Sequence, residues 1–178
     1  MDILFGIILT IIGIITPYLI NHYIRQKKSW NSVLKDVEKI YNDLKKNNYE
    51  PEILISFPKG GLIVADLLGH LYNNKIDIIS IHTERFFYDK RLTVSIRSEY
   101  INFEKIHNKR ILIIDDVIAG GETMAEIKKL LIAEKIPSQN IKTAVLGITS
   151  PTIFEPDFHS FKYNLNKTFY FPWGKLTL

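Results

Sequence analysis

The sequence contains no cysteine among its 178 residues, and this absence removes several classes of chemistry. Without thiols the chain forms no disulfide, uses no cysteine nucleophile and offers no cysteine-ligated zinc site. Its five histidines show no spacing typical of a metal centre. No G-x-x-x-x-G-K-[ST] motif occurs, which disfavours a P-loop nucleotide site. The chemistry of this chain must therefore come from other groups.

A strong charge imbalance is also lacking. The formal net charge is +4, with 46% hydrophobic and 24% charged residues, which is typical of a globular chain. The length predicts one domain with a substantial core. The modest positive charge suits anionic small ligands or anionic lipid and gives no reason to expect nucleic-acid binding. Internal repeats and low-complexity tracts are absent as well.

Charge is missing altogether from residues 3–20, ILFGIILTIIGIITPYLI. As a helix this run would reach about 27 Å, close to the hydrocarbon thickness of a bilayer. Basic residues follow it at Arg25, Lys27 and Lys28, whereas a cleaved signal peptide carries its basic residues first and a small-residue cleavage site afterwards. We therefore expect a single transmembrane helix in the cell membrane, with its N-terminus outside and the following chain in the cytoplasm. The alternative is a buried soluble helix with an apolar surface all round.

In the rest of the chain, segments with the helical spacing of apolar residues alternate with short apolar runs typical of buried strands. We expect residues 1–28 to form the anchor with its basic juxtamembrane segment, and residues 29–178 to form one domain. Spacings of three and four predict a helix over 29–48, capped by Ser29. Branched apolar runs predict buried strands at 53–57, 76–82, 110–115 and 142–149, with helices over 62–74 and 122–135. This alternation predicts an α/β fold, in which helices flank a parallel sheet.

Two adjacent acids end the third predicted strand in the stretch ILIIDDVIAGGETM, residues 111–124. Ligands of such sheets bind beyond the carboxyl ends of the strands, so we expect Asp115 and Asp116 to face sugar hydroxyls or a magnesium ion. Gly120 and Gly121 allow backbone amides to converge on an anion, and the next helix adds the partial positive charge of its N-terminus. Together with the Thr123 hydroxyl, these groups predict a sugar-phosphate site. The alternative is a solvated strand end followed by an ordinary turn.

At these residues the sequence resembles the type I phosphoribosyltransferases, nearest to the xanthine-guanine and adenine types. ILIIDDVIAGGET is similar to their signature for phosphoribosyl pyrophosphate (PRPP), and SFPKGGLIVADLL is similar to their pyrophosphate loop. The resemblance covers roughly residues 30–178. It implies that Asp115 and Asp116 bind the ribose hydroxyls and, indirectly, Mg²⁺. The implied 5-phosphate site consists of Ala119, Gly120, Gly121, Glu122 and Thr123, and the implied pyrophosphate site contains Lys59, Gly60 and Gly61.

The phosphate loop departs from the family pattern at one position. Glu122 stands where many members have glycine. Its carboxylate either repels the phosphate or points outward and favours the helix N-terminus, and we expect the outward orientation. Ala119 stands where members of the hypoxanthine-guanine type have a third acid, and adenine-type members also have Ala there. The resemblance therefore does not imply that residue 119 contacts N7 of a purine.

Two further stretches resemble mobile or base-binding parts of the family. The stretch HTERFFYDKRLTVSIRSEY, residues 82–100, occupies the place of the catalytic lid, where Lys90 and Arg91 are candidate partners of the leaving pyrophosphate or else solvated loop charges. The tail TFYFPWGK is similar to that of xanthine-guanine enzymes and predicts one short strand and a turn. Phe169 and Tyr170 are candidates for stacking on the base, or else core aromatics. The stretch LGITSPT lacks the lysine with which those enzymes bind the oxo group of a purine, so the sequence does not predict the identity of the base.

These expectations combine into a membrane-anchored phosphoribosyltransferase. It would transfer phosphoribosyl from PRPP to a nitrogenous base, purine-like by resemblance, with Mg²⁺ and with release of pyrophosphate. The resemblance also implies a homodimer and no covalent protein nucleophile. The alternatives are a catalytically weak sensor of nucleotides or PRPP, and a membrane effector of a defence or stress system. Pyrophosphate release, ligand binding without turnover, or nucleotide loss in cells would distinguish the three.

Overall fold

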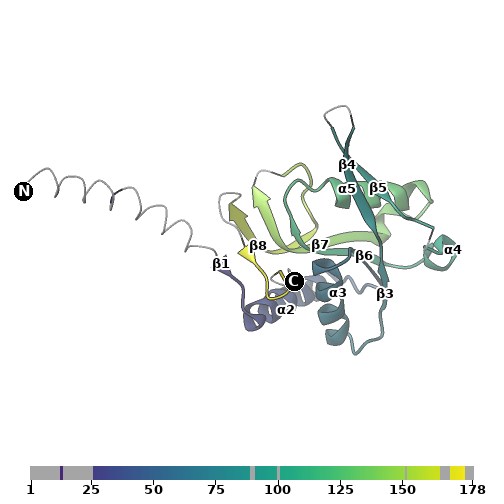
Figure 1. The fold of residues 1–178 in the computed structure, drawn as a ribbon. Coiled ribbons are helices and arrows are strands. Elements are labelled where there is room, and N and C mark those ends of the chain that lie inside the picture. The colour runs from purple at the N-terminus through teal and green to yellow at the C-terminus, as the bar shows by residue number, and fades with distance from the viewer. Residues whose placement is uncertain are drawn as a thin grey trace, which may run out of the picture.

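A five-stranded parallel sheet forms the centre of the molecule (Figure 1). The computed structural model describes residue 13 and residues 26–88, 91–99, 101–150, 152–164 and 169–174. The sheet order is β3-β2-β6-β7-β8. Its strands are β2 (Ile53–Ser56), β3 (Asp77–Ser80), β6 (Ile111–Ile118), β7 (Ile141–Ser150) and β8 (Phe158–Asn164). All of these neighbours pair in parallel, as the alternating pattern predicts.

Helices cover both faces of the sheet, and two separate buried clusters result. On one face, α2 (Trp30–Lys46) and α3 (Gly60–Leu71) pack on residues such as Leu54, Leu112 and Leu146. On the other face, α5 (Glu122–Ala133) packs on the alternate strand residues, such as Ile113 and Val145. Because successive strand residues point to opposite faces and both faces are covered, residues 53–55 of β2 and 111–114 of β6 are all apolar. The predicted α/β architecture is confirmed.

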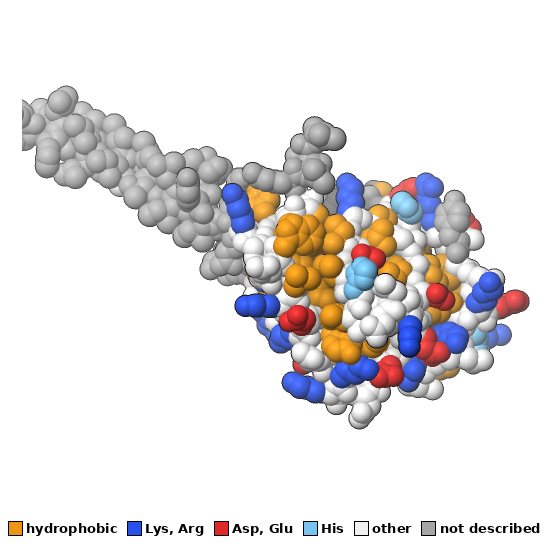
Figure 2. All heavy atoms as spheres, turned by 90° about the horizontal axis from the view of Figure 1, so that it is seen from below, with side chains coloured by type: hydrophobic (Ala, Val, Ile, Leu, Met, Phe, Trp, Pro, Cys, Tyr) orange, Lys and Arg blue, Asp and Glu red, His pale blue; other side chains and the backbone are white. Residues whose placement is uncertain are grey.

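Helix α2 begins and ends close to the predicted residues. The Ser29 hydroxyl accepts a hydrogen bond from the Ser32 amide at 3.2 Å, which caps the helix N-terminus. The helix ends at Lys46 with Asn47 as its C-cap, and Asn48 takes a positive φ of 52°. Apolar side chains on α2 and α3 that stay exposed include Trp30, Leu34 and Leu62. Figure 2 shows hydrophobic side chains gathered on one face of the domain.

Strand β6 is longer than the predicted 110–115, and this difference moves the two acids. β6 continues to Ile118 because it keeps its pairing with β7 as far as Ile118 and Ile148. Its pairing with β2 stops earlier, at Ile114 opposite Ser56. Asp115 and Asp116 therefore lie within β6 and not after it, beside the end of the shorter strand β2. The prediction that they sit at the carboxyl edge of the sheet holds relative to β2.

The segment with weak periodicity, 83–105, folds into a hairpin that the sequence did not predict. Strands β4 (Thr83–Tyr88) and β5 (Arg91–Ile96) pair antiparallel and project from the sheet (Figure 1). A one-turn helix, α4 (Phe103–Ile106), follows. Strand β8 was also not predicted, because its sequence FHSFKYN, at a sheet edge, has no continuous apolar run.

The two ends of the described domain pair with each other. Strand β1 (Gln26–Lys27) lies parallel to β9 (Phe169–Tyr170), with Gln26 opposite Phe169 and Lys27 opposite Tyr170. β9 confirms the short strand predicted in the tail. β1 was not predicted, since its residues are part of the expected basic juxtamembrane segment. A short 3₁₀ helix, η1 (Ser138–Asn140), leads into β7.

The predicted membrane anchor falls almost wholly on residues that the structure leaves undescribed. Among the described residues, no helix combines the length and the apolar character needed to cross a bilayer. Apart from Gly13, residues 3–20 lie outside the described part. The anchor, its orientation and the boundary between 1–28 and 29–178 stay predictions.

Candidate functional site

The acids of β6 press against the start of α3. After β2 the chain turns through Lys59, whose φ of 71° is unusual for a residue with a side chain, and α3 begins at Gly60. A Cβ atom on Gly60 would lie 1.8 Å from Asp116 Oδ2, and one on Gly61 would lie 2.8 Å from Asp115 Oδ1. Only glycine permits this approach. It brings two carboxylates to a helix N-terminus, where partial positive charge favours them.

Backbone amides fix the orientation of both carboxylates. Asp115 Oδ1 accepts a hydrogen bond from the Asp116 amide at 2.9 Å, and Asp116 Oδ1 accepts one from the Val117 amide at 2.8 Å. Asp116 Oδ2 accepts a third from Trp173 Nε1 at 3.1 Å. Hydrogen bonds to an ionised acceptor are about twice as strong as neutral ones. The two side chains are therefore held in place at the edge of the sheet, and both are partly exposed.

Two threonine hydroxyls hold the loop after β6 by hydrogen bonds. One threonine lies near the end of β7, and the other lies just after β7. Thr149 Oγ1 donates to the Ala119 carbonyl at 2.6 Å, and Thr152 Oγ1 donates to the Gly120 carbonyl at 2.8 Å. In a trans peptide the N–H group points opposite to the carbonyl. The amides of Gly120 and Gly121 are therefore directed away from these threonines. This orientation is what an anion-binding loop requires.

Gly121 is required by its conformation and by its neighbour. Its φ is +99°, in the left-handed region, and it caps the N-terminus of α5. A Cβ atom there would lie 2.5 Å from Phe154 Cβ. Glycine is the residue that takes such a φ without strain. The sequence folds here into a sharp strand-to-helix turn, which aims the first amides of α5 out of the helix.

A small hollow lies between β6 and this loop. Its volume is about 150 Å³. At about 30 Å³ for each water molecule, the space suits a phosphate-sized anion. Its lining consists of Asp115, Val117, Ile118, Ala119, Gly120, Gly121, Glu122, Thr123 and Met124. The predicted phosphate loop is thus one wall of a real cavity, with Asp115 on another.

Glu122 does not point outward, so that expectation is wrong. A Cβ atom on Gly120 would lie 2.3 Å from a Glu122 carboxylate oxygen, which shows that the side chain folds back across the loop. Glu122 is the first residue of α5, so this position keeps its negative charge near the helix N-terminus. The same position places the charge on the wall of the hollow.

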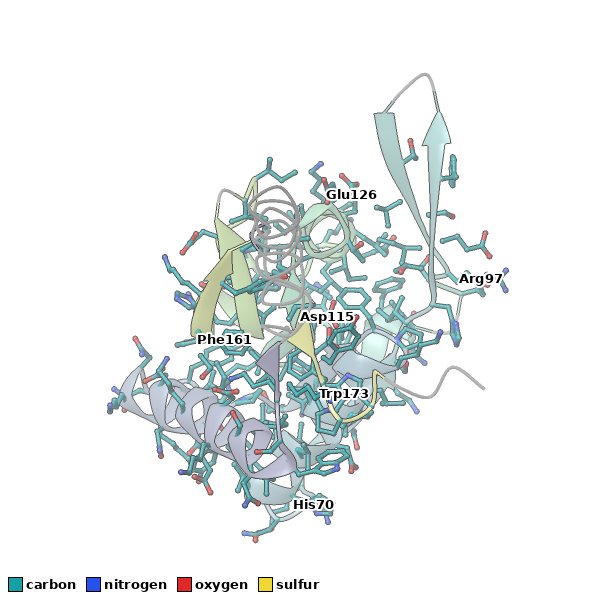
Figure 3. All side chains as sticks on the ribbon, turned by 60° about the vertical axis from the view of Figure 1, so that its left-hand side comes forward. His70, Arg97, Asp115, Glu126, Phe161 and Trp173 are labelled. Carbon is teal, nitrogen blue, oxygen red and sulfur yellow. The ribbon has the colours of Figure 1, made fainter. Side chains whose placement is uncertain are left out.

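The remaining predicted residues are not all brought to this site. Lys59 is exposed at the turn before α3. Lys90 lies outside the described residues, and Arg91 opens β5 in the projecting hairpin with its side chain outside the described part. Glu84 of β4 pairs with Arg97 at 2.5 Å, and Arg97 lies to one side of Asp115 in Figure 3.

The aromatic tail reaches the site through a residue that the sequence interpretation did not choose. Trp173 bonds to Asp116, and its ring stacks on Phe171 with centroids 4.6 Å apart and an interplanar angle of 9°. Figure 3 shows Trp173 beside the region of Asp115. Of the two predicted stacking residues, Tyr170 lies in β9 and the Phe169 side chain is outside the described part. The Pro-Trp pair in the tail was the signal that pointed to Trp173.

The donor set of this site suits a metal bound together with a ligand. No group of three or more histidine, aspartate or glutamate side chains in the described ranges is placed to hold a metal ion alone. Mg²⁺ usually takes one or two carboxylates and completes its shell with water and substrate phosphates. Asp115 and Asp116 beside an anion-sized hollow fit that pattern.

Several solved structures of other proteins have a similar fold. A purine phosphoribosyltransferase from Pyrococcus horikoshii Ot3 has a similar structure, with a TM-score of 0.67 and 25% identity over 85% of this chain and 95% of that one. A hypothetical protein from Neisseria gonorrhoeae with bound ppGpp gives a TM-score of 0.71 at 18% identity, over 86% and 92%. Helicobacter pylori xanthine-guanine-hypoxanthine phosphoribosyltransferase gives 0.67 at 18%, over 84% and 93%. The comparison with curated proteins gave no match.

The family itself is shown by sequence. The model of the phosphoribosyl transferase domain matches residues 26–174, which include both acids, both glycine loops and Trp173. A match over most of the chain decides membership, so this protein belongs to the phosphoribosyltransferase domain family.

Proposed function

We propose that the protein is a membrane-anchored phosphoribosyltransferase that transfers phosphoribosyl from PRPP to a purine-like base. One observation carries the proposal: Asp115 lies against Gly61 at the start of α3 and lines the hollow bounded by residues 117–124, and Asp116 lies against Gly60. Two anion sites on either side of two hydroxyl-binding acids match a sugar that carries phosphate groups at both ends. Membership of the family supports the same assignment.

Each part of PRPP has a counterpart in this arrangement. The ribose hydroxyls would donate to Asp115 and Asp116, whose orientation is fixed by backbone amides. The 5-phosphate would occupy the hollow beside residues 119–123, where the α5 N-terminus favours an anion. The pyrophosphate would lie at the α3 N-terminus, near Lys59. Lys90 and Arg91 of the hairpin would approach it on closure.

The reaction needs no covalent intermediate on the protein. A nitrogen of the base forms a bond to C1 of the ribose and gives up its proton to water or to the departing pyrophosphate, while the bond from C1 to the pyrophosphate oxygen breaks and pyrophosphate leaves with both electrons of that bond. Asp115 and Asp116 would help to hold Mg²⁺, which would neutralise charge on the pyrophosphate. The residues of the site bind the two ends of PRPP and orient C1 toward the base.

The base and the cellular setting belong to the proposal as well. Phe169 and Tyr170 are proposed to stack on a planar base. Residues 1–28 are proposed to anchor the protein in the cell membrane with the catalytic domain in the cytoplasm, because an uncharged run of 18 residues precedes basic ones. A homodimer is proposed from the family resemblance alone.

Pyrophosphate release tests the proposed activity. The full chain in detergent is incubated with PRPP, Mg²⁺ and a panel of purine bases, and pyrophosphate and nucleotide are measured together. We expect equal amounts of both products with at least one base, and loss of both in Asp115→Asn/Asp116→Asn. Release of pyrophosphate without any nucleotide, or no release with any base, contradicts the proposal.

A second function is favoured by the position of Glu122. Its carboxylate lies on the wall of the hollow and raises the electrostatic cost of a phosphate there. The similar protein from Neisseria gonorrhoeae has bound ppGpp, a guanine nucleotide with two pyrophosphate groups. The alternative is therefore a catalytically weak sensor of nucleotides or PRPP, or a membrane effector in a defence or stress system. Saturable ligand binding without turnover would support the sensor, and nucleotide loss in cells the effector.

A further inference from the structure

The Trp173 side chain lies where the two halves of the site meet. Its Nε1 atom donates to Asp116 Oδ2 at 3.1 Å. The same atom would lie 2.9 Å from a Cβ atom on Gly60, the first residue of α3. The indole therefore stands beside the contact between the acid and the α3 N-terminus. This is the side on which the proposed ribose and pyrophosphate would meet.

A short turn and a ring stack hold Trp173 there. The Gly174 amide donates to the Phe171 carbonyl at 2.9 Å and closes the turn that contains Trp173. Phe171 is only 7% exposed, and its ring lies parallel to the indole. Trp30, at the start of α2, touches the indole from another direction, with centroids 5.8 Å apart. The position of the indole therefore depends on how the tail is attached to the domain.

The tail is attached through β1. The Lys28 amide donates to the Tyr170 carbonyl at 2.9 Å and extends the pairing of β1 with β9. The Lys28 ammonium group pairs with Asp36 of α2 at 2.7 Å and lies 3.8 Å from the centroid of the Phe161 ring of β8. Asp36 in turn accepts from Ser160 Oγ at 2.6 Å. The segment that follows residues 3–20 is thus fixed to the domain and holds the C-terminal tail.

A ribose hydroxyl that binds Asp116 Oδ2 must compete with the indole for this oxygen, and Gly60 packs against the same oxygen. Oδ1 accepts from the Val117 amide, and Oδ2 accepts from the indole. Resting on the proposed function, we propose that Trp173 is a latch: a positioning residue that occupies Asp116 in the ligand-free protein and is displaced by the ribose of PRPP. The β1–β9 pair links this latch to residues 26–28.

Tryptophan emission tests the contact without any ligand. The chain has two tryptophans, so in full-length Trp30→Phe the emission comes from Trp173 alone. We expect a red shift and stronger acrylamide quenching when Asp116→Ala is added to Trp30→Phe, because the indole loses its acceptor. Saturating PRPP with Mg²⁺ should shift the emission of Trp30→Phe in the same direction. Unchanged emission in the double variant overturns the latch.

PRPP affinity tests the consequence. PRPP carries no base, so its affinity does not depend on stacking between the tail and a base. We expect full-length Trp173→Phe, which keeps a ring but loses the N–H donor, to bind PRPP about tenfold more tightly, the change expected from one charge-assisted hydrogen bond. The matched control Trp30→Phe, which touches the indole but not Asp116, should bind like the wild type.

The outcomes separate the latch from the proposed function. Wild type that binds PRPP as tightly as Trp173→Phe, or more tightly, overturns the latch and leaves the transferase proposal standing. PRPP binding by neither protein overturns the proposed function and displacement by PRPP together. In that case, a shifted emission in Trp30→Phe/Asp116→Ala still supports the contact with Asp116.

Discussion

The two edges of the central sheet use polar groups in opposite ways. At the edge where the strands begin, polar side chains form hydrogen bonds that link neighbouring segments. At the edge where β2 ends, carboxylates and a glycine turn surround a hollow. Both edges belong to the same sheet and differ only in the residues that follow or precede the strands.

At the first edge, hydrogen bonds link the beginnings of neighbouring strands. The buried hydroxyl of Tyr49 lies 2.7 Å from the Ile111 carbonyl and 2.8 Å from the Asn140 carbonyl, and bridges the entries to β6 and β7. Asp157, before β8, accepts from Lys142 and from the Thr143 amide, each at 2.9 Å. Burial raises the pKa of Tyr49 well above its usual range, so the hydroxyl stays a donor. This edge contributes stability.

The second edge keeps its acids at the surface. Asp115 and Asp116 accept from backbone amides of their own strand and lie against glycines of α3. Ligands of parallel sheets bind at this edge because helix N-termini and strand ends converge there. Substitutions at the first edge should therefore change stability, whereas those at the second should change ligand binding.

The largest expected effect comes from Gly60→Ala. Its Cβ atom would lie 1.8 Å from Asp116 Oδ2, so the acid must move, and a misplacement of about 1 Å can reduce activity about a hundredfold. We expect kcat/KM for PRPP to fall by that factor. The matched control is Gly69→Ala on the same helix, where the Cβ atom would lie 3.6 Å from Ile78 Cδ1. It should keep its activity and gain about 0.5–1 kcal/mol of stability. Equal activity of the two variants would refute the close packing at Gly60.

The next effect is on stability alone. Tyr49→Phe removes the donor shared by two carbonyls, one of them buried, and should lower the free energy of unfolding by about 2 kcal/mol. For a domain of this size that corresponds to a fall in Tm of about 4–8 °C. Thermal unfolding measures the shift, and PRPP affinity should not change below the transition. A change in affinity at unchanged Tm would remove the distinction between the edges.

Asp157→Asn should act with a pH dependence. Burial raises the pKa of Asp157, but hydrogen bonds from Lys142 and Thr143 outweigh it and hold the pKa below the usual 3.8. A depressed pKa contributes stability that is present above pH 3.8 and is lost as the pH falls through the folded value. We expect the variant to be about 1 kcal/mol less stable at neutral pH, with the difference shrinking below pH 4. Urea unfolding at several pH values measures it. A constant difference down to pH 2 would argue against this assignment.

The smallest expected effect concerns Glu122. Glu122→Gln removes a negative charge from the wall of the hollow and should tighten PRPP binding about threefold at low salt, less at high salt. The matched control is Glu126→Gln one turn later, whose carboxylate pairs with Lys129 at 2.6 Å on the exposed side. It should leave PRPP affinity unchanged. Weaker binding by Glu122→Gln would show that the carboxylate assists the ligand, for example through a cation.

Sequence patterns predicted the parallel sheet and the acids, because both depend on local signals. The branched runs predicted at 53–57 and 110–115 contain the uninterrupted apolar stretches ILI and ILII, as expected of strands buried on both faces. Gly120 and Gly121 were chosen for their turn chemistry, and Gly60 and Gly61 for the family resemblance. The structure places Gly60 and Gly61 against the two acids, and Gly120 and Gly121 on the hollow that Asp115 lines. A pattern in one segment was enough for each of these features.

The features that the sequence did not predict depend on contacts between distant segments. β1 exists because β9 lies beside it, more than 140 residues later. The acids fall within β6 because β7 continues its pairing, and Trp173 matters because the tail returns to Asp116. Glu122 folds back over Gly120 although its helix position alone also allows an outward side chain. Periodicity within a segment carries no information on such pairings.

Equilibrium binding of PRPP with Mg²⁺ tests the central claim most directly. Isothermal titration of the full chain compares the wild type, Tyr49→Phe and Asp115→Asn/Asp116→Asn below their unfolding temperatures. The predicted result is saturable binding of one PRPP per chain to the wild type and to Tyr49→Phe, and a loss of about a hundredfold or more in affinity for the double variant. Equal affinity in all three proteins, or no binding by the wild type, would contradict the account.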